Sequence, residues 1–234
     1  MLKTVLTKFL VSGYSTIWEA SGSPTLEETL KDINSDQNMY LLDIIEKERY
    51  SRLLEVGSGC GSRLIGLALK NPDKSYFGID LSFEAITSGK SFAKNLGLDN
   101  LEFKRGNLIT AELQPCDVIL SWATLMYIHP VKINLVVKKL IDRASQSIII
   151  IEPRAELGIN SRYSKMSKPG FSYRFDKKFT KLDARNKFYL SEVVRVPHAL
   201  WKPGMGTGYL YKFMRTQENH ECARRDSNPE PSDP

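Results

Sequence analysis

The amino-acid sequence predicts an α/β fold: a doubly wound, seven-stranded, mostly parallel sheet with helices on both faces. Short apolar runs alternate with longer amphipathic segments through the middle of the 234-residue chain. The runs are apolar at nearly every position, which is typical of parallel strands buried on both faces. A glycine-rich turn separates the first run from a helical segment, which is the strand-turn-helix order of a nucleotide-binding sheet edge.

The first half of the domain follows from this alternation. An amphipathic stretch over residues 25–48 predicts helical structure before the first strand. The elements expected next are strand Arg52–Val56, helix Arg63–Leu69, strand Tyr76–Ile79, a helix from Ser82 to about Leu96, and strand Leu101–Lys104. The sequence Asn71-Pro72-Asp73 stops the first of these helices, whereas Ser82 can cap the second and Gly97 can end it.

The second half continues the same order. The elements expected there are strand Asp117–Ser121, helix Val131–Ala144, strand Ser147–Ile151, and two further strands, Asn186–Val196 and Gly208–Arg215. The helix is amphipathic, and the last two strands are rich in aromatic and β-branched residues. Residues 155–180 are basic and aromatic without a clear period, so we expect a long loop or insertion, which in a compact domain is often functional.

This pattern divides the chain into three parts. Residues 1–49 are expected to form an N-terminal cap with helical structure, and residues 50–215 the α/β domain. Residues 216–234 are polar and rich in proline, so they cannot bury a core and are expected to be a disordered tail.

The composition limits the classes of protein to which the chain can belong. Its hydrophobic share of 41% and charged share of 26% are ordinary for a globular protein. No apolar run approaches the roughly 20 residues of a membrane-spanning helix, and the N-terminus lacks a clear signal peptide. Three widely spaced cysteines form neither a disulfide framework nor a metal cluster, so we expect a cytoplasmic protein without a metal site. The net charge of +6 suits an anionic partner or a merely solvated surface.

The segment Leu53–Gly61 (LLEVGSGCG) carries the strongest functional signal. Its glycines permit a tight turn and a close approach of the backbone to a ligand, and the next helix offers free N–H groups to an anionic group. A dinucleotide-binding turn needs the spacing G-x-G-x-x-G, whereas here Gly57, Gly59 and Gly61 are followed by Ser62. The turn therefore disfavours a dinucleotide. A purely structural turn is the alternative.

An acidic residue followed by G-x-G-x-G resembles the first motif of the class I (Rossmann-like) S-adenosylmethionine-dependent methyltransferase superfamily. The resemblance implies that Glu55 helps to hold the methionine end of S-adenosylmethionine. It also implies that the turn formed by Gly57, Ser58, Gly59 and Gly61 packs beneath that cofactor.

The next two motifs of this superfamily also have counterparts. Asp80 and Leu81 follow the second strand, and Asp80 lies about 20 residues beyond Gly61, the offset of a ribose-binding carboxylate. After the third strand the superfamily carries an aspartate for the adenine amino group; here Asn107 stands there, and its carbonyl oxygen can also accept. Leu108 would pack on the adenine. The alternatives are that Asp80 caps the next helix and that Asn107 lies in a surface turn.

The fourth motif is the fourth strand and the loop that follows it, which in this superfamily runs beside the methyl group that is transferred. Ser121 and Trp122 stand where this strand ends and are assigned to the cofactor. His129 is the candidate catalytic base because its pKa suits neutral pH, although His129-Pro130 also fits the start of a helix. Tyr127 is a candidate substrate contact, with packing as the alternative.

Two further segments are candidates for substrate contact. Tyr14 and Trp18 belong to an N-terminal segment that in many small-molecule members of the superfamily covers the cofactor, although Trp18 also suits a core position. Arg154 begins a basic, aromatic segment that extends to Arg174 and includes Arg162 and Lys168. Such residues bind nucleic acid by charge and stacking, grip a carboxylate or an anionic sugar, or form a solvated loop.

The four motifs together imply an S-adenosylmethionine-dependent methyltransferase that acts by in-line displacement on a small-molecule acceptor. An RNA or protein methyltransferase and a non-catalytic S-adenosylmethionine-binding protein are the alternatives. No Asn-Pro-Pro-Tyr-type motif follows the fourth strand, which argues against methylation of base amino groups. No membrane association is expected, and the oligomeric state is left open.

Overall fold

The computed structural model describes residues 24–154, 163–165, 170–201 and 206–216 of the chain. The helices are α2 (Leu26–Ile33), α3 (Asp36–Glu46), α4 (Ser62–Lys70), α5 (Phe83–Asn95), α6 (Pro130–Arg143) and α7 (Phe175–Leu182), with the 3-10 turns η1 (Leu125–Tyr127) and η2 (His198–Leu200). The strands are β1 (Arg52–Val56), β2 (Ser75–Asp80), β3 (Leu101–Arg105), β4 (Cys116–Trp122), β5 (Ala144–Pro153), β6 (Tyr163–Lys165), β7 (Phe171–Tyr173), β8 (Phe188–Arg195) and β9 (Gly208–Arg215).

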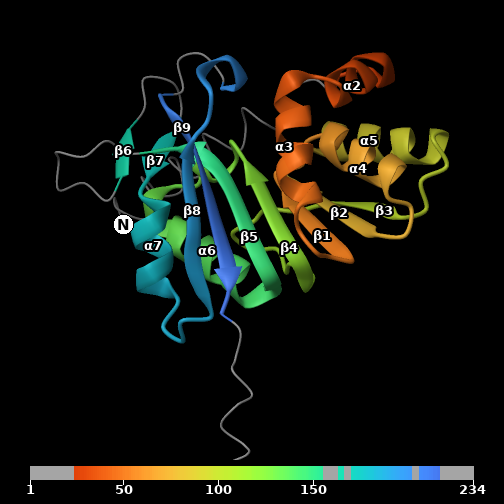
Figure 1. The fold of residues 1–234 in the computed structure, drawn as a ribbon. Coiled ribbons are helices and arrows are strands. Elements are labelled where there is room, and N and C mark those ends of the chain that lie inside the picture. Colours follow the sequence, from red (N-terminus) through yellow and green to blue (C-terminus); the bar gives the residue numbers. More distant parts are fainter. Residues whose placement is uncertain (1–23, 155–162, 166–169, 202–205, 217–234) are drawn as a thin grey trace, which may run out of the picture.

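Within the described residues, seven strands form one sheet in the order β3-β2-β1-β4-β5-β9-β8 (Figure 1). Strands β1 to β5 pair in parallel, whereas β9 runs antiparallel to both of its neighbours, β5 and β8. The predicted fold class, a seven-stranded and mostly parallel sheet, is therefore confirmed. The strand order reverses at β1, because β2 lies on one side of it and β4 on the other.

Helices cover both faces of this sheet, as Figure 1 shows. Helices α3, α4 and α5 pack with one hydrophobic cluster, which contains Leu53 on β1 and Ile149 on β5. Helices α6 and α7 pack with a second cluster on the opposite face, which contains Leu54 and Ile148. Neighbouring strand residues thus face opposite cores, so the strands must be apolar throughout. Each buried Leu or Ile side chain contributes about 1.5–3 kcal/mol to folding.

The helix boundaries follow the expected signals closely. Ser82 is the N-cap of α5, and its hydroxyl accepts a hydrogen bond from the Ala85 N–H. Gly97 ends the same helix with φ +66°, and the Leu98 N–H returns to the Ala93 carbonyl at 2.9 Å. The helical stretch before β1 is two helices, α2 and α3, which are separated at Asn34 and Ser35. Each signal acts within one turn of chain, which is why the sequence alone predicts it.

Two expectations about the second half need correction. The fifth strand was expected over Ser147–Ile151 but spans Ala144–Pro153, because its ends pair with Cys116 of β4 and Gly208 of β9. Residues 155–180 were expected to be a loop, yet β6, β7 and most of α7 lie within them. The helix was missed because its apolar positions, Phe175, Phe179 and Leu182, form a short stripe among lysines.

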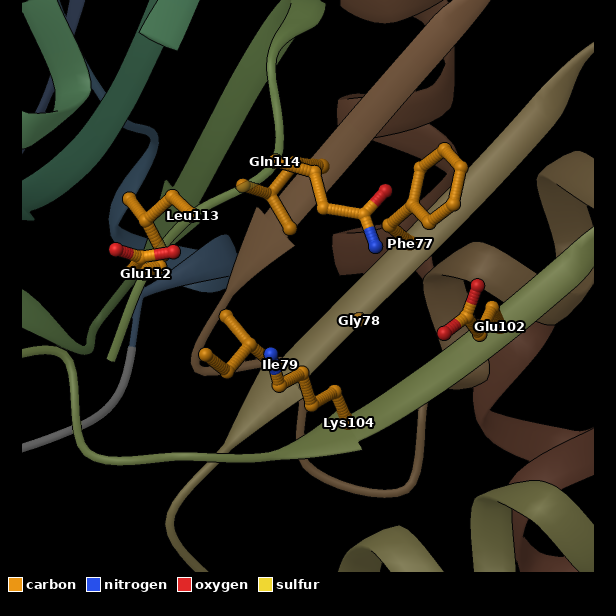
Figure 2. Close-up of a pocket in the computed structure, with 9 residues that line it drawn as sticks. Phe77, Gly78, Ile79, Glu102, Lys104, Glu112, Leu113 and Gln114 are labelled. Atoms are coloured by element: carbon orange, nitrogen blue, oxygen red, sulfur yellow. The ribbon is translucent and has the colours of Figure 1, made fainter. Parts of the chain in front are cut away.

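The connection between β3 and β4, described in full, contains no helix. One face of β2 and β3 is therefore bordered by residues 112–114 of this connection and holds a small, partly open cavity (Figure 2). Leu54, Phe77 and Ile79 supply its apolar floor, and Glu102 and Lys104 its polar rim. None of the glycine-turn residues lines this cavity, so it is separate from the site described next.

Candidate active site

The candidate site lies at the carboxyl ends of the parallel strands, where β1, β2, β4 and β5 end side by side. Val56 of β1 pairs in register with Ile79 of β2 and with Ser121 of β4. The turn after β1 is therefore flanked by the residues that follow both neighbouring strands. Ligands of open α/β sheets bind at this edge, at the point where the strand order reverses.

The glycine turn connects β1 to α4 in a conformation that only glycine adopts readily. Gly57, Gly59 and Gly61 have φ values of +73°, +57° and +85°, in the left-handed region that is strained for other residues. The N–H groups of Gly57 and Ser58 both donate to the Ile79 carbonyl, at 2.7 and 3.2 Å. The turn is therefore anchored to β2. Gly61 is the N-cap of α4 and makes no side-chain capping bond, which leaves helix N–H groups available at this edge.

Asp80 at the end of β2 joins the glycine turn to the next helix. Its carboxylate accepts hydrogen bonds from the Gly59 N–H at 2.9 Å and from the Ser82 N–H at 2.8 Å. These bonds fix the carboxylate beside the turn, and two oxygens with about four acceptor sites retain capacity for ribose hydroxyls. Ser82 caps α5, so Asp80 is not the helix cap. Leu81 follows at the edge, where its carbonyl accepts from the Arg105 Nε at 3.2 Å.

Glu55 is fully buried beneath the turn. Its Oε1 pairs with Arg63 of α4, with 2.6 Å to both Nε and NH2. Burial raises the pKa of the Glu55 carboxyl, and Arg63 opposes that shift. Among the described residues, Oε2 of Glu55 has no hydrogen-bond partner. A buried acceptor without a partner costs free energy, so its position here fits a donor supplied by a ligand.

The last residues of β4 form the wall beside this glutamate. Trp122 is buried and stacks on Trp201, with ring centroids 6.5 Å apart, while the Arg63 guanidinium lies 5.9 Å from the Trp122 ring. Trp122 Nε1 is a buried donor without a partner among the described residues. Ser121 faces the other side of the sheet and donates from its hydroxyl to Glu152 at 3.3 Å.

The loop after β4 is held by Glu152, a residue that the sequence reasoning missed. The buried Glu152 carboxylate accepts from the N–H groups of Thr124 and Leu125, each at 2.7 Å, and of Met126 at 3.2 Å. Burial raises the pKa of this carboxyl to about 7, although all of these hydrogen bonds oppose the shift. The available signal was a lone acid directly after the apolar run Ile148–Ile151, at the carboxyl end of a strand.

This loop also contacts the glycine turn. Ala123 has φ +49°, an uncommon conformation for a residue other than glycine. The Thr124 hydroxyl lies 3.5 Å from the Gly57 carbonyl, and a Cβ added to Gly57 would stand 2.0 Å from the Thr124 Oγ1. The first glycine therefore permits direct packing between the β1 turn and the β4 loop.

The predicted adenine segment follows β3. The Asn107 Oδ1 accepts a hydrogen bond from the Ile109 N–H at 2.9 Å, so this side chain stabilises a local turn. This contact agrees with the alternative that Asn107 lies in a surface turn. Leu108 is buried in the second core cluster. Lys139 of α6 holds this segment, because its Nζ donates to the carbonyls of Leu108, Ile109 and Ala111 at 3.2, 2.7 and 2.9 Å. Lys139 was not among the predicted site residues.

The candidate base and substrate residues lie on the β4–β5 side. His129 is the N-cap of α6, where its Nδ1 accepts from the Val131 N–H at 3.3 Å and Pro130 opens the helix. The structure therefore gives His129 the helix-start role, and its role as a base stays a prediction. Burial raises the pKa of the half-buried Tyr127, as does the nearby Glu152 carboxylate. Arg154 directly follows β5.

The remaining candidates, Tyr14, Trp18, Arg162 and Lys168, lie outside the described residues. No described helix is long and apolar enough to cross a membrane. In the same part of the chain, no group of three or more His, Cys, Asp or Glu side chains is arranged to hold a metal ion.

Comparison with known proteins places this geometry in context. Residues 47–182, more than half of the chain, match the model of a protein family described as a methyltransferase domain. A carboxy-S-adenosyl-L-methionine synthase from Nautilia profundicola is 24% identical over 150 residues, which is 64% of this chain and 64% of that relative, less than two thirds of its length. A tRNA (guanine-N(7)-)-methyltransferase from Christiangramia forsetii is 41% identical over 59 residues, 25% of this chain and 26% of that protein.

Solved structures share the fold. The magnesium protoporphyrin IX methyltransferase of Synechocystis PCC 6803, determined with bound SAH (S-adenosylhomocysteine), superposes with a TM-score of 0.60. The superposition covers 92% of this chain and 100% of that protein, at 12% sequence identity. The likeness at this identity establishes the shared architecture.

Proposed function

Because the chain belongs to the family of methyltransferase domains, we propose that it transfers the methyl group of S-adenosylmethionine to a small-molecule acceptor. The observation that carries this proposal is the junction of the glycine turn with Asp80 at the reversal point of the sheet. Glu55 and the glycine turn form the part of the proposed site that holds the cofactor. The loop after β4 forms the part that faces the methyl acceptor.

The residues at this edge fit S-adenosylmethionine. A Cβ added to Gly59 would meet no atom of the described residues within 4 Å, so these residues leave the space above this glycine open. Glu55 Oε2 and Trp122 Nε1 are a buried acceptor and a buried donor without partners among the described residues. We assign Glu55 to the methionine end, Asp80 to the ribose hydroxyls and the Asn107–Leu108 turn to the adenine.

The chemistry requires little of the protein beyond placement. S-adenosylmethionine supplies a methyl group that its positively charged sulfur already activates. The chain holds the acceptor atom in line, which converts a bimolecular encounter into a reaction between oriented groups. Glu152 fixes Thr124, Leu125 and Met126 and so shapes the loop over which the acceptor would lie. A base is needed only if the acceptor atom carries a proton at neutral pH.

Labelled S-adenosylmethionine tests the proposal. The protein is incubated with [methyl-³H]S-adenosylmethionine and, in separate reactions, with a cell extract filtered to small molecules, with total RNA and with unfolded protein. We expect label in the small-molecule fraction, and loss of that label in Asp80→Ala. Label that enters only RNA would favour the second candidate, which the short similarity to a tRNA methyltransferase supports, and would overturn the small-molecule assignment.

A further inference from the structure

A second polar cluster lies next to the loop that Glu152 holds, at the place where β5 ends beside β9 and α7. Arg154 follows β5, and its N–H donates to the Thr207 carbonyl at 3.1 Å. Tyr209 and Tyr211 of β9 pair with Glu152 and Ile150 of β5. Because paired residues of adjacent strands share a face, the two tyrosines lie on the face of the sheet that also carries Glu152. The cluster therefore borders the proposed acceptor side of the active site.

The cluster carries an excess of positive charge. Arg174, the N-cap of α7, grips Asp176 through its Nε at 3.0 Å and its NH2 at 2.5 Å. Arg154 reaches the same carboxylate with one longer contact of 3.4 Å from its NH2. Two guanidiniums thus share one carboxylate, which leaves a net charge of +1. The side chains are only 14–22% exposed, so solvent screens this charge incompletely.

The described residues occupy little of the hydrogen-bonding capacity of Arg154. Its guanidinium lies 4.9 Å from the Tyr209 ring, which holds the group by a cation–π contact and uses no N–H donor. Its contact with Asp176 is the one side-chain hydrogen bond it makes to the described residues. A guanidinium has five N–H donors in a fork that matches a carboxylate or a phosphate. Within the part of the chain that the structure describes, the fork of Arg154 is therefore held in place with most of its donors unused.

Tyr211 supplies an independent observation. The residue is completely buried, and its hydroxyl has no hydrogen-bond partner among the described residues. The Tyr211 ring lies 6.5 Å from the Tyr209 ring, which the Arg154 guanidinium contacts, so Tyr211 borders the cluster. Burial raises the pKa of the Tyr211 hydroxyl, which therefore remains a protonated donor. A buried hydroxyl without an acceptor costs folding free energy, whereas a phenylalanine of the same shape would not incur that cost.

We propose that Arg154 and Tyr211 form a subsite for an oxyanion, a carboxylate or a phosphate, carried by the methyl acceptor. The Arg174–Asp176 pair holds Arg154 in place but is not itself the ligand-binding group. The anion is a handle that orients the acceptor, distinct from the atom that receives the methyl group. This inference rests on the proposed function only in assigning the anion to the acceptor, since anion binding itself requires no catalysis.

Titration with simple anions tests the subsite without catalysis. Benzoate and phenyl phosphate are added separately to ¹⁵N-labelled full-length protein, with and without saturating SAH, and the amide shifts of residues 206–211 give each dissociation constant. We expect saturable binding of at least one anion. Arg154→Gln should weaken it by about tenfold or more, and Tyr211→Phe by about threefold to tenfold, since each removes charge-assisted or neutral donors. The tighter of the two probes identifies the group as carboxylate or phosphate.

Two controls separate binding from structure. Arg215→Gln removes a guanidinium that also stacks on an aromatic ring, Phe188, and donates to the Ala144 carbonyl at 3.2 Å, but Arg215 lies at the opposite end of β9. It should bind both anions as the wild type does. Tyr211→Phe should retain or increase the unfolding temperature while it weakens binding, which a packing role would not produce.

The same experiment contains the outcomes that would overturn the subsite. These are absence of saturable binding, or equal dissociation constants for Arg154→Gln, Tyr211→Phe and wild type. A protein that binds the anions but not SAH would contradict the proposed function while leaving the subsite in place. The two proposals can therefore fail separately.

Discussion

Replacement of Gly59 by alanine should weaken cofactor binding while leaving the fold intact. Gly59 has φ +57°, and an added Cβ would meet no atom of the residues that the structure describes within 4 Å. The substitution therefore costs the ligand-free protein only backbone strain, about 1–2 kcal/mol for a residue in the left-handed region. Gly57 is unsuitable for this test, because a Cβ there would stand 2.0 Å from Thr124 and disturb the loop directly.

Gly97 provides a matched control. It has φ +66°, and a Cβ added there would likewise meet no described atom within 4 Å, but Gly97 ends α5 away from the glycine turn. Gly59→Ala and Gly97→Ala should therefore lower the unfolding temperature equally, by roughly 2–8 °C for a chain of this size. A methyl group in the space assigned to the cofactor should cost about 1.4–2.8 kcal/mol of binding, or tenfold to a hundredfold in Kd.

The assay is calorimetric titration of both variants and the wild type with SAH, together with thermal unfolding. We expect a larger Kd for Gly59→Ala and a wild-type Kd for Gly97→Ala, while the two variants have similar unfolding temperatures. Equal Kd values for the two alanine variants would refute the placement of the cofactor over Gly59. A large loss of stability in Gly59→Ala alone would refute the reasoning that the space above this glycine is open.

Three other predictions concern the residues that hold the site. Glu152 has its carboxyl pKa raised from 4.5 to about 7, so the folded state binds the proton more tightly and its stability falls as pH rises from about 4.5 to 7. The free energy of unfolding in urea is measured for the wild type and for Glu152→Gln, and the wild-type value minus the variant value should fall by roughly 3 kcal/mol over this window. A difference that does not change with pH would contradict the burial argument. Lys139→Met should leave three carbonyls without their donor and weaken SAH binding by about threefold to tenfold, whereas the exposed neighbour Lys138→Met should not; equal affinities would remove Lys139 from the site. Arg63→Met should lower the free energy of unfolding by about 3–5 kcal/mol, because it leaves the buried Glu55 carboxylate without its partner. Denaturant unfolding measures this loss, with Arg52→Met, which replaces an exposed arginine, as the control. Similar losses in the two variants would show that the Arg63–Glu55 pair does not stabilise the fold.

Local signals in the sequence account for most of the cofactor side of the site. The glycine turn, the acid that ends β2 and the cap at Ser82 are each specified within a few residues, because turns and caps depend on nearby backbone conformation. The parallel sheet was predictable for a similar reason, since strands such as Ile148–Ile151 must be apolar on both faces.

The acceptor side depends on contacts between distant parts of the chain. Glu152 was outside the predicted strand, and nothing near it in sequence shows that its carboxylate receives three N–H groups from the loop after β4. The stacking of Trp122 on Trp201 and the contact of Lys139 with the Leu108 carbonyl likewise join segments that only the folded sheet brings together. Pairings of this kind require a tertiary structure.

Direct binding of the cofactor tests the central claim. The full-length protein is titrated calorimetrically with S-adenosylmethionine, SAH and, separately, NAD⁺, and each titration is repeated with Asp80→Ala. The glycine turn and Asp80 predict one S-adenosylmethionine or SAH molecule per chain, weaker binding by at least about tenfold in Asp80→Ala, and no heat of binding with NAD⁺. Binding of NAD⁺ without binding of S-adenosylmethionine or SAH would contradict the assignment of this sheet edge to a methyltransferase cofactor.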